Sequence, residues 1–185
     1  NHGTYPYVTC GQATAAAIYS AGFNFKLDHV YGVGKAYTTR VGEGPFPTEL
    51  IGGDETKLRE IGKEFGATTG RPRRVGWLDI PAMDYACKVG GVTDLIITKF
   101  DILNNYGTIK VCEKYKRAPT SPGDFNTAEP VYTELQAWSD AKDLPQLKQI
   151  IKMIEKGTNK KVAYISYGVN KEDLIQTNGQ LNLNI

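Results

Sequence analysis

The segment from residue 65 to residue 74 carries the residue types best suited to binding a small anion. It reads FGATTGRPRR and holds two glycines, two threonines and three arginines. The glycines permit turns and close backbone approach, and Pro72 stiffens the spacing between Arg71 and Arg73. Arginine forks match carboxylates and phosphates through paired hydrogen bonds. A solvated basic turn has the same composition, so the residue types alone leave both interpretations open.

Two shorter segments follow short apolar runs. Residues 98–101 read TKFD after the run at 95–97, and residues 166–168 read SYG after the run at 162–165. The carboxylate of Asp101 can accept hydrogen bonds from the N1–H and the exocyclic amine of guanine, a donor pair that adenine lacks. A lysine stem can cover the flat ring while its head stays in water. Aspartate after a strand is also a common turn former, so this signal is weak by itself.

Composition excludes several classes of protein. The 185 residues suffice for one domain with a core, and 41% of them are hydrophobic. A net charge of +2, from 22 basic and 20 acidic residues, gives no bulk attraction to nucleic acid or to an anionic membrane. No apolar run approaches the roughly 20 residues that span a bilayer. Cys10, Cys87 and Cys112 form no C-x-x-C pair, which favours a reducing compartment over a disulfide framework or a zinc site.

Periodicity in the first half predicts two helices and a strand region. Residues 12–21 are alanine-rich and stop at a glycine, which is typical of a short helix. Residues 29–41 predict one long strand or two short ones, and His29 is expected to be structural there. Residues 42–53 hold four glycines and two prolines and predict a loop. Residues 56–65 carry apolar side chains at helical spacing before the next glycine.

The second half alternates helices and strands. Asp79 is expected to cap a helix that runs to Gly90. The other expected elements are short strands at 95–97 and 162–165, a half-exposed strand at 108–116, a loop at 118–126 and a helix at 145–156 that ends at Gly157. The polar tail after Gly168 is expected to be disordered. This alternation predicts an α/β fold with a partly parallel sheet, where ligands bind at the carboxyl ends of the strands.

Four blocks, in order, resemble the C-terminal part of the adenylosuccinate synthetases. They are GTYPYVT at 3–9, KAYTTRVGEGPFPTE at 35–49, the segment 65–79 and TKFD at 98–101. The resemblance runs from residue 1 to about residue 176. It implies a P-loop-NTPase-like α/β fold, with a mostly parallel sheet and flanking helices, of which residues 1–185 form the C-terminal portion of a single domain. The abrupt opening, Asn1-His2-Gly3, also reads as sequence from the middle of a domain, so we expect an incomplete fragment without the N-terminal phosphate-binding half.

The resemblance also implies a reaction. This family joins IMP and L-aspartate at the expense of GTP, in cytoplasmic homodimers that use Mg²⁺. The magnesium ligands and the catalytic residues are expected in the missing half, so the resemblance places neither a catalytic residue nor a metal ligand in this chain. We therefore expect the fragment alone to be inactive, and no nucleic-acid or membrane partner is implied.

Individual roles transfer by matched position. Thr9 and Arg71 are expected to contact IMP. The loop from residue 67 to residue 73 is expected to bind aspartate, through Ala67, Thr68, Thr69, Gly70, Arg71, Pro72 and Arg73. The residues expected to bind GTP are Arg73, Lys99, Phe100, Asp101, Ser166, Tyr167 and Gly168.

The sequence leaves two alternatives open. One is a viral-type relative that uses dGMP in place of IMP, a choice made largely by residues outside this chain. The other is a fragment that binds a nucleotide or a partner without turnover.

Overall fold

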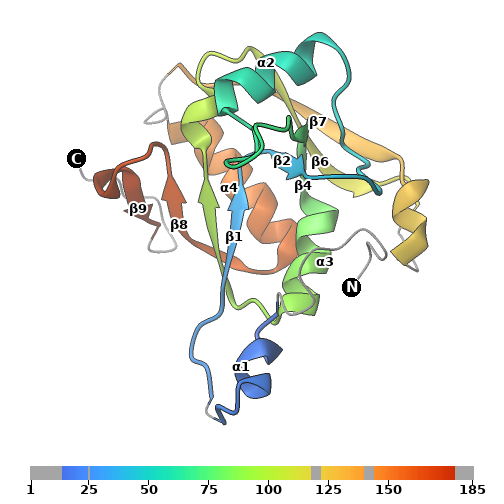
Figure 1. Cartoon of the computed structure of the whole chain (residues 1–185). Coiled ribbons are helices and arrows are strands. Elements are labelled where there is room, and N and C mark those ends of the chain that lie inside the picture. The colour runs from blue at the N-terminus through green and yellow to red at the C-terminus, as the bar shows by residue number, and fades with distance from the viewer. Residues whose placement is uncertain (1–13, 25, 118–121, 140–143, 178–185) are drawn as a thin grey trace.

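The fold is built around a four-stranded sheet whose first three strands run parallel. The computed structural model describes residues 14–24, 26–117, 122–139 and 144–177. The strand order is β1-β5-β8-β9, and only β9 is antiparallel to its neighbour. Their bounds are β1 Tyr31–Lys35, β5 Asp94–Thr98, β8 Lys161–Ser166 and β9 Leu174–Gln176. The carboxyl ends of β1, β5 and β8 therefore meet at one edge, the upper edge in Figure 1.

Helices and two smaller sheets surround this sheet. Helices α3 (Ile80–Gly90) and α4 (Leu144–Thr158) pack on each other, and α4 lies against β8. Helix α2 (Gly53–Gly62) lies over the carboxyl edge, and the short α1 (Ala16–Ser20) lies at the opposite end. The remaining elements are β2 Thr38–Arg40, β3 Arg74–Gly76, β4 Leu78–Asp79, β6 Thr108–Tyr115, β7 Pro130–Gln136, η1 Phe100–Leu103, η2 Pro122–Asn126 and η3 Lys171–Asp173.

The α/β prediction is confirmed, and so are the elements with strong local signals. Asp79 caps α3 by accepting a hydrogen bond from the backbone of Ala82 at 3.0 Å. In β6 the apolar side chains are buried while Lys114 is exposed, as the alternation predicts. The core joins side chains such as Ile97 of β5 and Ile154 of α4.

The structure corrects several predicted boundaries and the predicted disorder of residues 171–176. Helix α2 ends at Gly62 because Lys63 adopts a left-handed conformation with φ of 52°, which leaves Ile61 and Phe65 about two-fifths exposed. Helix α4 continues through Gly157, where an added methyl would collide with Ile80; the glycine serves close packing and does not end the helix. Residues 171–176 of the tail form η3 and β9, because β9 pairs with the free edge of β8.

The structure also adds strands that periodicity did not indicate. Strand β7 is an antiparallel partner of β6. Strand β3 is an antiparallel partner of β2, which is the second of two short strands between residues 29 and 41. Within the described ranges, the helices are all too short or too polar to cross a membrane.

Gly76 in β3 is a site where a single methyl should destabilise the fold. A Cβ there would collide with the backbone oxygen of Thr48 and with the ring of Phe46. Since a backbone atom cannot yield cheaply, we expect Gly76→Ala to lower the free energy of unfolding by about 1–3 kcal/mol. Gly53→Ala is the matched control, because nothing lies within 4 Å of its Cβ position. Equal unfolding curves for the two variants would contradict this packing.

Candidate functional site

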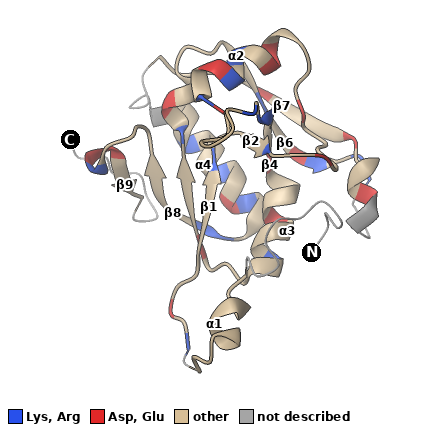
Figure 2. Ribbon diagram, viewed as in Figure 1, with Lys and Arg blue, Asp and Glu red and all other residues tan. Residues whose placement is uncertain are grey.

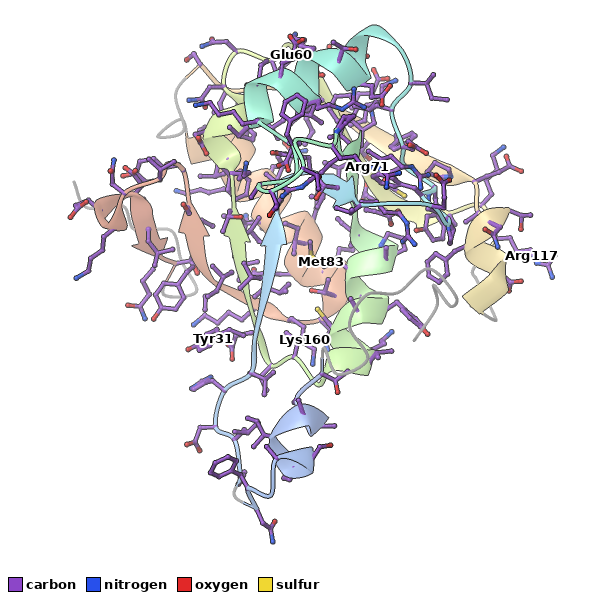
Figure 3. All side chains as sticks on the ribbon, viewed as in Figure 1. Tyr31, Glu60, Arg71, Met83, Arg117 and Lys160 are labelled. Atoms are coloured by element: carbon purple, nitrogen blue, oxygen red, sulfur yellow. The ribbon has the colours of Figure 1, made fainter. Side chains whose placement is uncertain are left out.

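The segments expected to bind ligands come together at the carboxyl edge of the main sheet. Lys35 ends β1 opposite Thr98, and Lys99 follows directly after β5. Ser166 ends β8, the other neighbour of β5. Figure 3 places Arg71 beneath α2, in this upper part of the molecule. In Figure 2, charged residues gather on α2 and around this loop, while the strands below are mostly uncharged.

A buried carboxylate, that of Glu64, lies at the centre of this edge. Its side chain has no exposed surface. Its oxygens accept hydrogen bonds from Lys35 Nζ at 2.8 and 2.9 Å, from Tyr37 Oη at 2.5 Å and from Arg73 Nη1 at 2.7 Å. Lys99 Nζ lies 3.3 Å from Oε1. The carboxylate is thus surrounded by donors from both sides of the sheet edge.

The local backbone explains how Glu64 comes to point inward. The left-handed turn at Lys63 ends α2 and redirects the chain. Gly62 has no side chain where a Cβ would lie 2.6 Å from the hydroxyl of Tyr37, so that hydroxyl reaches the carboxylate unobstructed. The carbonyl of Gly62 accepts a hydrogen bond from Lys99 Nζ at 2.7 Å, and Lys99 is itself left-handed with φ of 64°.

The charges at this edge are strongly coupled. Burial alone would raise the pKa of Glu64, but hydrogen bonds from Lys35, Tyr37 and Arg73 outweigh it and bring the pKa to about 2. Burial, and next its hydrogen bond to Glu64, raise the pKa of Tyr37, so its hydroxyl stays a donor. Three cations, Lys35, Arg73 and Lys99, face the single carboxylate of Glu64, so this cluster carries a net positive charge, which favours an anionic ligand.

The loop between residues 65 and 72 is closed by its own backbone. Phe65 and Pro72 form an antiparallel bridge, and the N–H of Gly66 donates to the carbonyl of Arg71 at 2.9 Å. Gly70, with φ of 64°, donates to the carbonyl of Gly66 at 2.9 Å. This closure leaves Thr68, Thr69 and Arg71 exposed.

The three arginines of the segment have different surroundings. Within the described part of the chain, no ion pair or hydrogen bond engages the Arg71 guanidinium, whereas Arg73 is paired with Glu64. Arg74 is bound by Glu49 through two contacts of 2.6 and 2.5 Å and by two loop carbonyls. Arg74 is therefore a brace between the loop at 42–49 and β3.

The 99–101 segment presents Lys99 and Asp101 beside a core residue. The side chain of Phe100 is fully buried against Trp138, with ring centroids 5.7 Å apart. Phe100 could therefore contact a ligand only through its backbone. Asp101 is half-buried in the first turn of η1.

The 166–168 segment is shaped by contacts within its own turn. Ser166 Oγ donates to the carbonyl of Gly168 at 2.9 Å, and the backbone N–H of Tyr167 donates to the carbonyl of Asp173 at 3.1 Å. The carboxylate of Asp173 fills the space beside Gly168 where a side chain would begin. Thr9 lies outside the described residues.

Known proteins share both the sequence and the fold of this chain. The sequence model of the adenylosuccinate synthetase family matches residues 1–175. The chain belongs to this family. The adenylosuccinate synthetase of Petrotoga mobilis is 52% identical over 183 residues, and that of Thermotoga maritima is 47% identical over 178 residues. These alignments cover 95% and 94% of this chain but only 43% and 44% of the relatives, so the chain spans less than half of their length.

Solved structures agree with this family assignment. A fully ligated adenylosuccinate synthetase from Plasmodium falciparum superposes with a TM-score of 0.83 at 35% identity, over 93% of this chain and 46% of that one. A succinoaminodeoxyadenylate synthetase of cyanophage S-2L, bound to dGMP and dATP, reaches a TM-score of 0.55 at 19% identity, over 94% of this chain and 41% of that one. The second likeness shows a shared fold only.

The donor groups of the described residues do not form a metal site. Among these residues, no group of three or more histidines, cysteines, aspartates or glutamates could hold a metal ion. Glu64 is already saturated by cationic and hydroxyl donors, so its carboxylate has no place for a cation. In this arrangement Glu64 therefore cannot serve as a magnesium ligand.

Glu64 and Lys35 belong to the site, although no sequence pattern assigned them a role. Both lie inside or beside blocks that carry the family resemblance. One signal was present: several basic residues that converge on one edge need a counter-charge close by. Lys35 and Arg73 are 29 and 9 residues away from Glu64 in the sequence, so local periodicity could not identify the pairing.

The low pKa of Glu64 makes a specific prediction for acid stability. The folded pKa of about 2 lies below the ordinary value of 4.5, so the ionised carboxylate stabilises the fold fully above pH 4.5. That contribution, on the order of 3 kcal/mol, is lost as pH falls from 4.5 toward 2. In urea unfolding across this window, Glu64→Gln should lose less stability than the wild type. Glu60→Gln, on the exposed face of α2, should behave like the wild type, and parallel losses in all three proteins would contradict the ion-pair network.

Proposed function

We propose that the complete protein containing this chain joins IMP and L-aspartate to form adenylosuccinate, with GTP as the energy source. Membership of the adenylosuccinate synthetase family supports this proposal. The observation that carries it is that the loop ending at Arg73 and the segment beginning at Lys99 meet on Glu64 at the carboxyl edge of the sheet. The identities of 52% and 47% to named synthetases favour IMP over dGMP as the acceptor, because the phage enzyme is only 19% identical.

For the nucleotide, we propose that the segment 99–101 reads the guanine base. Asp101 would accept the two donors on the guanine edge, and the Lys99 stem would cover the ring. Because Phe100 is buried, its contribution would be its backbone position. The adjoining segment 166–168 would line the same base from β8, with Arg73 near the phosphates.

For the amino acid, we propose that the loop at 67–73 binds L-aspartate. The exposed hydroxyls of Thr68 and Thr69 and the Arg71 fork suit a dicarboxylate. Arg71 would also reach the IMP ribose, and Thr9 the IMP phosphate. These contacts would orient the aspartate amine toward the purine, and such positioning of the two reactants is a major contribution to catalysis in a ligation.

Family membership also supports proposals about domain organisation, localisation and oligomeric state. Residues 1–185 would form the C-terminal portion of one domain, and the phosphate cradle, catalytic groups and Mg²⁺ ligands would lie in the rest of the protein. We also propose a cytoplasmic homodimer.

The direct test supplies IMP, GTP, Mg²⁺ and L-aspartate to the complete protein and follows adenylosuccinate. We expect turnover by the complete protein and none by purified residues 1–185, because phosphoryl transfer needs charge neutralisation that this part does not provide. The preparation must come from a host that lacks its own synthetase. Failure of the complete protein to form product would refute the proposed function. Turnover by residues 1–185 alone would refute the proposal that the catalytic groups lie in the rest of the protein.

Arg71→Lys tests the aspartate loop. A single ammonium cannot replace a bidentate fork, so the KM for aspartate should rise about tenfold or more. Arg117→Lys is the matched control, since Arg117 is also exposed but lies just beyond the end of β6. An aspartate KM equal to that of the control would remove Arg71 from the proposed site.

Asp101→Asn tests guanine recognition. The amide can donate where the carboxylate only accepts, so the variant should lose GTP and gain xanthosine triphosphate as its best nucleotide. Each lost charge-assisted bond should be worth on the order of 1.5–3 kcal/mol. Asp54→Asn removes an exposed carboxylate from α2 and should keep the preference for GTP. If Asp101→Asn also keeps it, Asp101 is only a turn residue.

A further inference from the structure

Glu64 is the one group at this edge, among the described residues, that touches both proposed ligand segments. It pairs with Arg73, which ends the loop at 67–73, and lies 3.3 Å from Lys99, which begins the guanine-reading segment. These two cations come from opposite sides of the edge and share no other partner in the described part of the chain. Glu64 has no exposed surface, so its own contact with a substrate is excluded.

The carboxylate is also held so firmly that it can serve as a fixed point. A carboxylate offers about four lone-pair sites. Lys35 and Tyr37, at the end of β1 and just after it, take three of them, because Lys35 bonds both oxygens. Arg73 takes the fourth, and Lys99 forms an ion pair with Oε1 at 3.3 Å. Lys35 is held in turn by the hydroxyl of Thr39 at 3.0 Å. Through these contacts, Glu64 fixes the positions of both ligand segments relative to the main sheet.

We propose that Glu64 is a positioning residue that couples the aspartate loop to the guanine-reading segment by holding Arg73 and Lys99 on one buried carboxylate. The proposal rests on the proposed function for the identity of the two ligands. If Glu64 couples the two segments, its loss should increase the mobility of both segments at once. A residue with a merely structural role would lower stability without moving the two Michaelis constants together.

The test compares Glu64→Gln with Glu49→Gln in the complete protein. Glu49→Gln is the matched control because it also removes a carboxylate from an arginine of the same segment, but that arginine, Arg74, braces the neighbouring sheet. Glu64→Gln should raise the KM for GTP and for L-aspartate together, each about tenfold or more, with a smaller change in kcat. Glu49→Gln should lower Tm and leave both KM values within about twofold of the wild type.

A second measurement does not depend on catalysis. Amide hydrogen exchange of the ligand-free protein should accelerate in Glu64→Gln at both 66–72 and 99–103, and in Glu49→Gln at neither. If the wild type shows no turnover, the proposed function fails while this exchange comparison still decides the coupling. Exchange that changes in only one of the two segments would overturn the proposal.

The kinetic outcomes are equally decisive. Unchanged KM values in Glu64→Gln, or a rise for one substrate alone, would overturn the coupling. Should Glu64→Gln fail to fold, Glu64→Asp keeps the charge but draws the carboxylate back by one methylene from Arg73 and Lys99. It should raise both KM values together by at least about threefold, and normal constants in that variant would also overturn the proposal.

Discussion

The architecture of the site depends on one buried negative charge. A carboxylate without exposed surface is costly to bury unless donors surround it, and Glu64 meets this condition with contacts from Lys35, Tyr37 and Arg73 and a nearby Lys99. Because these donors come from the end of β1, the end of the loop and the end of β5, satisfying one carboxylate places three segments at once. The need to pair that charge thus determines where the sheet edge, the loop and η1 meet.

The backbone on both sides of this charge is strained, and the same contacts hold it. Lys63 and Lys99 are both left-handed, a conformation that costs a non-glycine residue about 1–3 kcal/mol. Lys63 must turn to end α2 and aim Glu64 inward. Lys99 must turn to lead from β5 into η1, and its ammonium then reaches the carbonyl of Gly62 and the carboxylate of Glu64. Strain at these two lysines is therefore compensated by two contacts of Lys99, with Gly62 and Glu64 on either side of Lys63.

Local signals predicted the elements well and the network poorly. The cap at Asp79 and the alternation in β6 depend only on neighbouring residues, so the sequence alone predicts α3 and β6. The apolar spacing continues to Phe65 and predicts a helix that is too long. The left-handed turn that ends α2 is formed by Lys63, and the sequence gives no glycine signal at that position. Strand β9 was missed because its stability comes from pairing with β8 rather than from its own polar sequence. The three arginines of the 65–74 segment look alike in sequence, and only their long-range partners give them different roles.

The difference between Arg71 and Arg73 also bears on how such a site would select its ligands. Arg73 is held in place before any ligand arrives, so a ligand that meets it does not have to order its side chain. Arg71 has no such partner among the described residues and would lose rotamer freedom when it closes on a ligand. Glu64 neutralises only part of the charge of Lys35, Arg73 and Lys99, so the edge stays positive enough to attract anions while the cations do not drive one another apart. A second buried carboxylate in this cluster would weaken its attraction for anions. Without Glu64, the cations Lys35, Arg73 and Lys99 would repel one another, so one buried glutamate both holds the cations together and leaves the cluster positive.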